Sequence, residues 1–152
     1  NTAIGWIAGF GKKAEPSSKF FLFAKDGYPA YGGILVTRND LIQTKPEVLQ
    51  RFVKASMEGW KSYLKNPAPG NALIKKENRN MDDALLAFGV AQMKSLGLIE
   101  GGDAKTMGIG VMTDARWSKT RDFMVQSKLL KPQTQWKSAY TLQFVQPKSN
   151  KN

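Results

Sequence analysis

The sequence contains no cysteine and no histidine among its 152 residues. Without cysteine, the chain can form neither a disulfide nor a thiolate nucleophile or metal site of its own. Without histidine, it lacks the commonest general base and the commonest metal ligand. Ser-His-Asp and Cys-His mechanisms are therefore excluded within this chain. Long apolar runs are also missing, because no stretch of about 18 uncharged apolar residues occurs, so no transmembrane helix is predicted.

Acidic residues are scarce, with 12 Asp and Glu against 23 Lys and Arg. The nearest pair, Asp82 and Asp83, is adjacent on a predicted helix and therefore points in directions about 100° apart. This spacing favours a role at the positive end of the helix dipole over an acid–base pair. No metal-ligand spacing and no phosphate-binding loop occur. The sequence thus predicts no catalytic residue, no metal and no cofactor, and we expect a protein that is not an enzyme.

The net charge of +11 is compatible with three kinds of partner: nucleic acid, an anionic membrane surface or a small anionic ligand. The basic residues are spread along the chain. There is no arginine-rich arm, zinc-finger spacing or aromatic RNA-binding signature. The pattern favours a solvated surface that steers anions weakly, and no nucleic-acid partner is predicted.

Apolar residues make up 41% of the chain, enough for a core. Short apolar runs at 2–10, 19–24 and 33–37 predict buried strands, and residues 38–40 predict a turn. The stretch from Pro46 to Asn66 predicts a long amphipathic helix. A strand that leads into such a helix is typical of an α/β fold.

The long helix has clear local signals. Pro46 suits its first position, Glu47 complements its dipole, and Asn66-Pro67 ends it. Its apolar residues recur with a period of 3.6 and predict one packed stripe: Leu49, Phe52, Val53, Trp60, Tyr63 and Leu64. We expect Trp60, like Trp117 on a later helix, to anchor the core.

The second half of the chain is also predicted to be mainly helical. We expect the following elements in order: a turn at Pro67–Gly70, a helix at 71–77, a helix capped by Asn80 that ends near Gly97, a glycine-rich loop at 100–112, a helix at 114–128 capped by Thr113, and a final segment at 136–145.

Four motifs, taken in order, resemble a known family. They are DGYPAYG at 26–32, KPEVLQRFVKASMEGW at 45–60, GIGVMTDARW at 108–117 and AYTLQF at 139–144. The chain resembles the second half of the substrate-binding proteins of ABC importers, in the class that binds nitrate, aliphatic sulfonates, taurine or pyrimidine precursors of thiamine. The resemblance extends from about Ala3 to Val145.

The resemblance implies part of a type II periplasmic-binding-protein-like fold, α/β with two lobes, here helix-rich with a few strands. Residues 1–40 would supply strands and the hinge segment of the second lobe, residues 41–145 a helical remainder, and residues 146–152 a disordered tail. The chain would be a C-terminal fragment of a receptor. Its partners would be a small-molecule ligand (an anion, a sulfonate or a pyrimidine) and an ABC permease, in the periplasm or on the outer face of the cytoplasmic membrane.

On positions that match the family, the ligand-binding residues would be Gly5, Trp6, Tyr28 and Tyr31. Trp6 fits a buried strand equally well. The two tyrosines offer a stacking face and a hydroxyl for a cleft, but packing on a sheet surface explains them about as well.

Two alternative functions stay open at this point. The same fold supports a pyrimidine-precursor synthase, whose histidine and cysteine motifs this chain lacks. A basic nucleic-acid-binding module would bind DNA with a steep salt dependence. If the chain is a half-receptor, as the resemblance implies, it would expose apolar surface, which predicts a homodimer.

Overall fold

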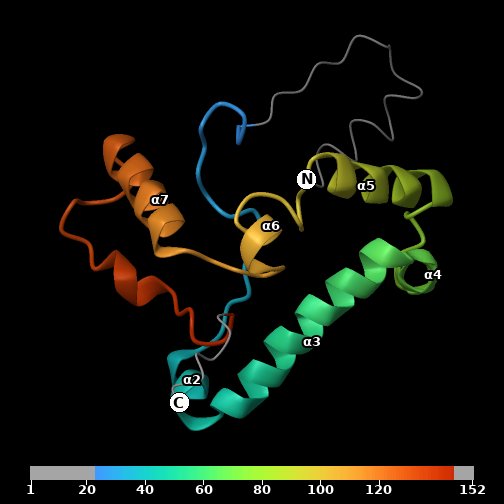
Figure 1. Cartoon of the computed structure of the whole chain (residues 1–152), viewed down its shortest axis with the longest axis horizontal. Helices are drawn as coiled ribbons and strands as arrows, with labels where there is room; N and C mark the ends of the chain where they lie inside the picture. The colour runs from blue at the N-terminus through green and yellow to red at the C-terminus, as the bar shows by residue number, and fades with distance from the viewer. Residues whose placement is uncertain (1–22, 146–152) are drawn as a thin grey trace.

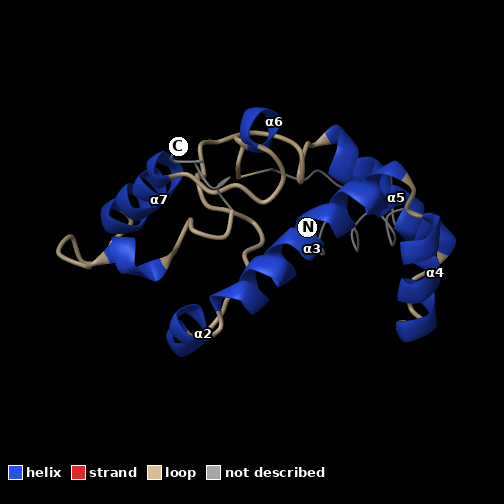
Figure 2. Cartoon of the chain, turned by 60° about the horizontal axis from the view of Figure 1, so that its bottom comes forward, coloured by secondary structure: helices blue, strands red, loops and turns tan. Residues whose placement is uncertain are grey.

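The computed structural model describes residues 23–145, and all regular elements in that range are helices. Figures 1 and 2 show α3 as the longest helix, with α4 and α5 beyond its C-terminal end and α7 on the other side of the molecule. The elements are α2 (Asn39–Thr44), α3 (Pro46–Lys65), α4 (Ala68–Glu77), α5 (Asp83–Ser95), α6 (Ala104–Met107), α7 (Asp114–Gln126) and the 3₁₀ helix η1 (Trp136–Ala139).

The predicted strand at 33–37 is wrong, since no strand occurs between residues 23 and 145. A strand requires a neighbour for its backbone N–H and C=O groups, and this apolar run has none there. Ile34 and Val36 are accordingly exposed, at 53% and 83%. The predicted turn at 38–40 is also wrong in part, because α2 already begins at Asn39.

The other two predicted strands lie wholly or mostly outside the described residues. The end of the second falls in a turn, where the carbonyl of Phe23 accepts hydrogen bonds from the amides of Asp26 and Tyr28. Gly27 takes a φ of +90° there, as the Asp-Gly turn signal predicts. An α/β fold is therefore not visible in the described part of the chain, which is helical.

The ends of α3 confirm the sequence prediction. Pro46 is its first residue, and Asn66 leaves the helical region with ψ 96° because Pro67 follows. The predicted turn at Pro67–Gly70 is wrong, however, because α4 starts at Ala68. Proline is compatible with a helix start, and the side-chain oxygen of Asn66 accepts a hydrogen bond from the Ala68 amide at 3.2 Å.

Capping side chains fix the starts of α5 and α7. Asp82, not the predicted Asn80, caps α5 by accepting a hydrogen bond from the Leu85 amide at 2.7 Å. Asp82 has the extended backbone that a cap requires, whereas Asn80 lies two residues outside it. Thr113 is confirmed as the cap of α7 and accepts from the Arg116 amide at 3.3 Å.

Two boundaries differ from the sequence prediction in the second half. The glycine-rich loop contains the one-turn helix α6, and α7 ends at Gln126. α5 ends as predicted near Gly97, whose φ of +59° lets the Leu98 amide reach back to the Met93 carbonyl at 3.0 Å. This left-handed glycine is the usual device for satisfying the last carbonyls of a helix.

The core is small and is contributed by α3, α5, the glycine-rich loop and the C-terminal segment. The buried apolar side chains are Leu64, Leu86, Ile109, Val111 and Phe144, and no polar side chain is buried in the described range. The glycine loop packs on α3 closely enough that a Cβ on Gly110 would lie 3.1 Å from Met57. From the other end of the chain, the carbonyl of Phe144 accepts a hydrogen bond from the Gln50 side chain at 3.3 Å.

The core covers only one edge of the α3 stripe. Phe52 and Trp60 remain 59% and 41% exposed. The prediction that Trp60 anchors the core is therefore wrong, because no layer of the described structure covers that edge. Within residues 23–145, this edge of α3 is exposed apolar surface.

None of the helices in the described range is long and apolar enough to cross a lipid bilayer.

Candidate functional site

Tyr31 is fixed by a hydrogen-bond cluster at the start of α7. Its hydroxyl accepts a hydrogen bond from the Thr113 amide at 2.8 Å and donates to Asp103 Oδ2 at 3.4 Å. The Thr113 hydroxyl donates to the same carboxylate oxygen at 3.2 Å. The first amides of a helix have no carbonyl partner within the helix. At the start of α7, the Tyr31 hydroxyl accepts the hydrogen bond of one of them, the Thr113 amide.

Arg116 completes the cluster from the first turn of α7. Its Nε donates to the Pro29 carbonyl at 2.8 Å and one Nη to the Ala30 carbonyl at 3.2 Å. The same guanidinium lies over the Tyr31 ring, 4.2 Å from its centroid. Arg116 therefore holds both the backbone and the ring of the segment, and we call Tyr31, Asp103, Thr113 and Arg116 the Tyr31 cluster.

An aromatic stack borders the Tyr31 cluster. The rings of Trp117 and Tyr140 are parallel within 5° with centroids 4.7 Å apart, and the Tyr31 ring lies 5.9 Å from Trp117. Trp136 extends the stack, 6.1 Å from Tyr140. Trp117 is half-buried in this stack, which is consistent with its predicted packing role. Its Nε1 is buried and has no hydrogen-bond partner within the described structure.

Tyr140 is the group in the site whose pKa departs most from its ordinary value. Partial burial, together with the hydrogen bond that its hydroxyl donates to Asp114, raises the pKa of Tyr140 to about 12. A nearby carboxylate and a less polar surrounding both disfavour a second negative charge. The phenol of Tyr140 therefore stays neutral throughout the physiological range.

This pKa predicts an alkaline loss of stability. Between the ordinary tyrosine pKa of 10.0 and about 12, the unfolded chain releases the Tyr140 proton while the folded chain keeps it. The folded state then binds more protons, so the free energy of unfolding falls as pH rises through this range. Denaturation at several pH values should show this fall, and Tyr140→Phe should reduce it. An unchanged pH profile in Tyr140→Phe would contradict the assignment.

Tyr28, in the segment before Tyr31, packs against the second half of α7 and is more exposed than Tyr31. Its ring is 44% exposed and packs edge-on against Phe123 at 5.2 Å and against Phe23 at 6.4 Å. The structure thus places two of the four predicted ligand residues, Tyr28 and Tyr31, along α7. The other two, Gly5 and Trp6, lie outside the described residues. The hydroxyl of Tyr31 is occupied by internal hydrogen bonds, whereas Tyr28 is 44% exposed.

Sequence reasoning did not assign Asp103 or Arg116 to the site. Arg116 belongs to the GIGVMTDARW motif, which was a signal that this stretch matters, but its partners lie more than 80 residues earlier in the chain. Asp103 follows two glycines and gave no signal of its own. Residues 29–31, Asp103 and residues 113–116 come together only in the folded chain.

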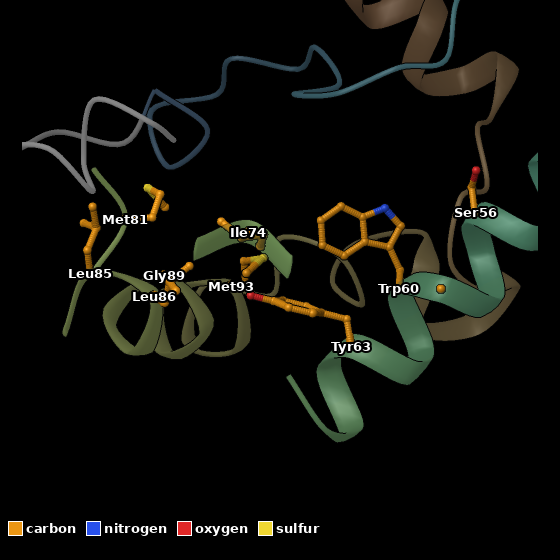
Figure 3. Close-up of a pocket in the computed structure, with 10 residues that line it drawn as sticks. Ser56, Trp60, Tyr63, Ile74, Met81, Leu85, Leu86, Gly89 and Met93 are labelled. Atoms are coloured by element: carbon orange, nitrogen blue, oxygen red, sulfur yellow. The ribbon is translucent and has the colours of Figure 1, made fainter. Parts of the chain in front are cut away.

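A second candidate site is a groove between α3, α4 and α5, with a volume of about 510 Å³. Figure 3 shows the rings of Trp60 and Tyr63 projecting from α3 toward α5. The Tyr63 hydroxyl donates to Asn71 at 2.7 Å, and burial raises its pKa. The groove is lined by Ser56, Gly59, Trp60, Tyr63, Ile74, Met81, Leu85, Leu86, Gly89 and Met93.

The chemistry of the groove is apolar. No charged side chain lines it, so it offers no countercharge to a nitrate or sulfonate. The Tyr31 cluster, by contrast, contains the guanidinium of Arg116, which is held over the ring of Tyr31. Over residues 23–145, no group of three or more acidic side chains is placed to hold a metal ion.

Comparison with known proteins gives one family match. Residues 4–69 match a family model of nitrate, sulfonate and thiamine-precursor binding proteins, and this match suggests a periplasmic-binding-protein-like fold. The model is described as NMT1/THI5 like, and its match covers less than half of the chain. No curated protein matches the sequence, and no solved structure matches the fold.

Proposed function

We propose that this chain is the C-terminal part of the solute-binding component of an ABC importer. The observation that carries the proposal is the family match over residues 4–69, which spans the Tyr28–Tyr31 segment and all of α3. The ligand is a small anion, a sulfonate or a pyrimidine. The receptor works in the periplasm or on the outer face of the cytoplasmic membrane and delivers its ligand to a permease.

The geometry of the Tyr31 cluster supports a ligand position beside Tyr28. Two carbonyl bonds hold the Arg116 guanidinium in place, so its positive charge needs no rearrangement to meet an anionic group. Tyr28 is one residue from the Pro29 carbonyl that Arg116 binds, and its exposed ring offers a stacking surface. Arg116 bonds the backbone directly after Tyr28, and a positive charge and an aromatic ring on one short segment suit both a sulfonate and an aromatic base.

Calorimetric titration with nitrate, taurine, an alkyl sulfonate and an aminopyrimidine tests this proposal. Binding of one of them, weakened at least tenfold by Tyr28→Ala, is the expected result. Leu129→Ala is the matched control, because Leu129 is 69% exposed and lies outside the Tyr31 cluster and the stack. Equal affinity in Tyr28→Ala and Leu129→Ala would overturn the proposed ligand position.

A second candidate function follows from the family description, which includes the THI5 type. Such a protein would be a pyrimidine-precursor synthase on the same fold. The two functions differ in the fate of the ligand. A binding protein leaves a bound precursor unchanged after prolonged incubation, whereas a synthase consumes its precursor as the pyrimidine appears. Mass spectrometry would follow both compounds.

A further inference from the structure

Asp26 and Gly27 form the only Asp-Gly pair of the sequence, which contains no Asn-Gly pair. In such a pair the backbone nitrogen of the glycine can attack the side-chain carboxyl of the aspartate, because glycine has no side chain to hinder the approach. Both residues are exposed and lie in the turn before Tyr28, in the loop that Figure 1 draws in blue. The turn therefore joins an electrophilic carboxyl group to the backbone nitrogen that can react with it.

The carboxylate of Asp26 differs from those of the other aspartates, all of which lie in the described part of the chain. Each of the others accepts a hydrogen bond or forms an ion pair: Asp40, Asp82, Asp83, Asp103, Asp114 and Asp122. The carboxylate of Asp26 has no such partner among residues 23–145. It is therefore free to turn toward the backbone nitrogen of the next residue.

The Gly27 amide lies between two amides that are both hydrogen-bonded. The carbonyl of Phe23 accepts hydrogen bonds from the Asp26 amide at 3.1 Å and from the Tyr28 amide at 2.9 Å. The Gly27 amide itself donates to no backbone carbonyl in the described range. Its residue has a φ of +90°, and a Cβ placed there would meet nothing within 4 Å. Neither a hydrogen bond nor a neighbouring atom thus blocks the reaction at this nitrogen.

We propose that Asp26 is a modification site, at which the chain isomerises spontaneously to isoaspartate. The Gly27 nitrogen bonds to Cγ of Asp26; the carboxylic acid loses its hydroxyl group and the amide its proton, and the two leave as water. A water molecule then opens the resulting succinimide ring. Breaking the new bond to Cγ restores aspartate, whereas breaking the original bond to the backbone carbonyl carbon leaves isoaspartate. The water released is the water taken up, so no co-reactant is needed.

Isomerisation at Asp26 changes the turn that positions Tyr28. The main chain then passes through the former side chain of Asp26, which adds one carbon atom between the Phe23 carbonyl and the Tyr28 amide that bonds to it. The longer turn moves the Tyr28 amide off this carbonyl and its ring off Phe123, which it contacts edge-on at 5.2 Å. The modification thus releases Tyr28, and it does not depend on the proposed solute-binding function.

Ageing of the 152-residue chain at neutral pH and body temperature tests the proposal. Digestion with a protease that cleaves before aspartate but not before isoaspartate, followed by electron-transfer fragmentation, measures isoaspartate at each site. We expect at least tenfold more at Asp26 than at Asp83, Asp103 or Asp114. Alanine follows each of these three internal controls, and their carboxylates are bonded. Equal levels at the four sites, or none at Asp26, would overturn the proposal.

Asp26→Glu is the matched variant, because it keeps the charge but would have to close a larger and less favourable ring. Amide hydrogen exchange at Tyr28 should become at least tenfold faster as the unaltered chain ages and should stay constant in Asp26→Glu. Equal acceleration in both chains, or constant exchange in an isolated isoaspartate form, would show that isomerisation does not release Tyr28. Neither readout involves a ligand, so failure here leaves the proposed solute-binding function untouched.

Discussion

Replacing Gly101 with alanine should destabilise the fold by about 2–3 kcal/mol, the cost of forcing extra atoms into a tightly packed site. A Cβ at this position would lie 2.2 Å from the carbonyl oxygen of Gly97 and 3.0 Å from its carbonyl carbon. These are backbone atoms of the turn that ends α5, and the Gly101 amide donates to that same oxygen at 2.8 Å. The clash can be relieved only by opening this turn.

The consequence of Gly101→Ala should reach the Tyr31 cluster. Asp103 lies two residues further on and binds both the Tyr31 and Thr113 hydroxyls. A displaced turn would move this carboxylate away from both partners. Amide hydrogen exchange should therefore accelerate at Thr113 as well as around Gly101.

Gly89→Ala provides the matched control for Gly101→Ala. Gly89 lies inside α5, and a Cβ there would meet nothing within 4 Å. Alanine should stabilise that helix by about 0.5–1 kcal/mol because it restricts the unfolded chain. Urea denaturation followed by tryptophan fluorescence should give opposite signs for the two variants. A loss below about 0.5 kcal/mol in Gly101→Ala would contradict the close contact, as such a change is typical of neutral surface positions.

Replacing Arg116 with alanine should also have a large effect and lower the free energy of unfolding by about 2–3 kcal/mol. The variant loses both carbonyl bonds to the Pro29–Ala30 backbone and the cation beside the Tyr31 ring. No other side chain in the described structure bonds to those two carbonyls. Hydrogen exchange should show faster opening at Tyr31 than in α3.

Arg116→Lys separates the geometry of the guanidinium from its charge. Lysine keeps the positive charge but cannot bond two carbonyls with a planar fork. We expect it to recover less than half of the stability lost in Arg116→Ala. Full recovery would mean that only the charge matters, and would contradict the bonding that the structure shows.

The features that could be predicted from the sequence are those set by local chemistry. Pro46 and Asn66-Pro67 define the ends of α3 because each restricts its own backbone or its neighbour's. The cap at Thr113 could be predicted for the same reason, since its hydroxyl bonds an amide three residues away.

The features that could not be predicted depend on distant partners. The run at 33–37 has the composition of a strand, but a strand forms only where another strand pairs with it. Trp60 has the helical spacing of a core residue, yet its exposure depends on whether a further layer covers α3. Arg116 and Tyr31 lie too far apart in the sequence for any spacing rule to join them.

The most direct test of the proposed solute-binding role is a nuclear magnetic resonance titration of the isotope-labelled chain with the same four ligands. The proposal predicts that one ligand shifts the amide resonances of Tyr28, Ala30, Tyr31 and residues 113–117, around Tyr28 and the Tyr31 cluster. Shifts confined to the apolar groove, at residues 59–63 and 89–93, or no shifts with any ligand at millimolar concentration, would contradict it.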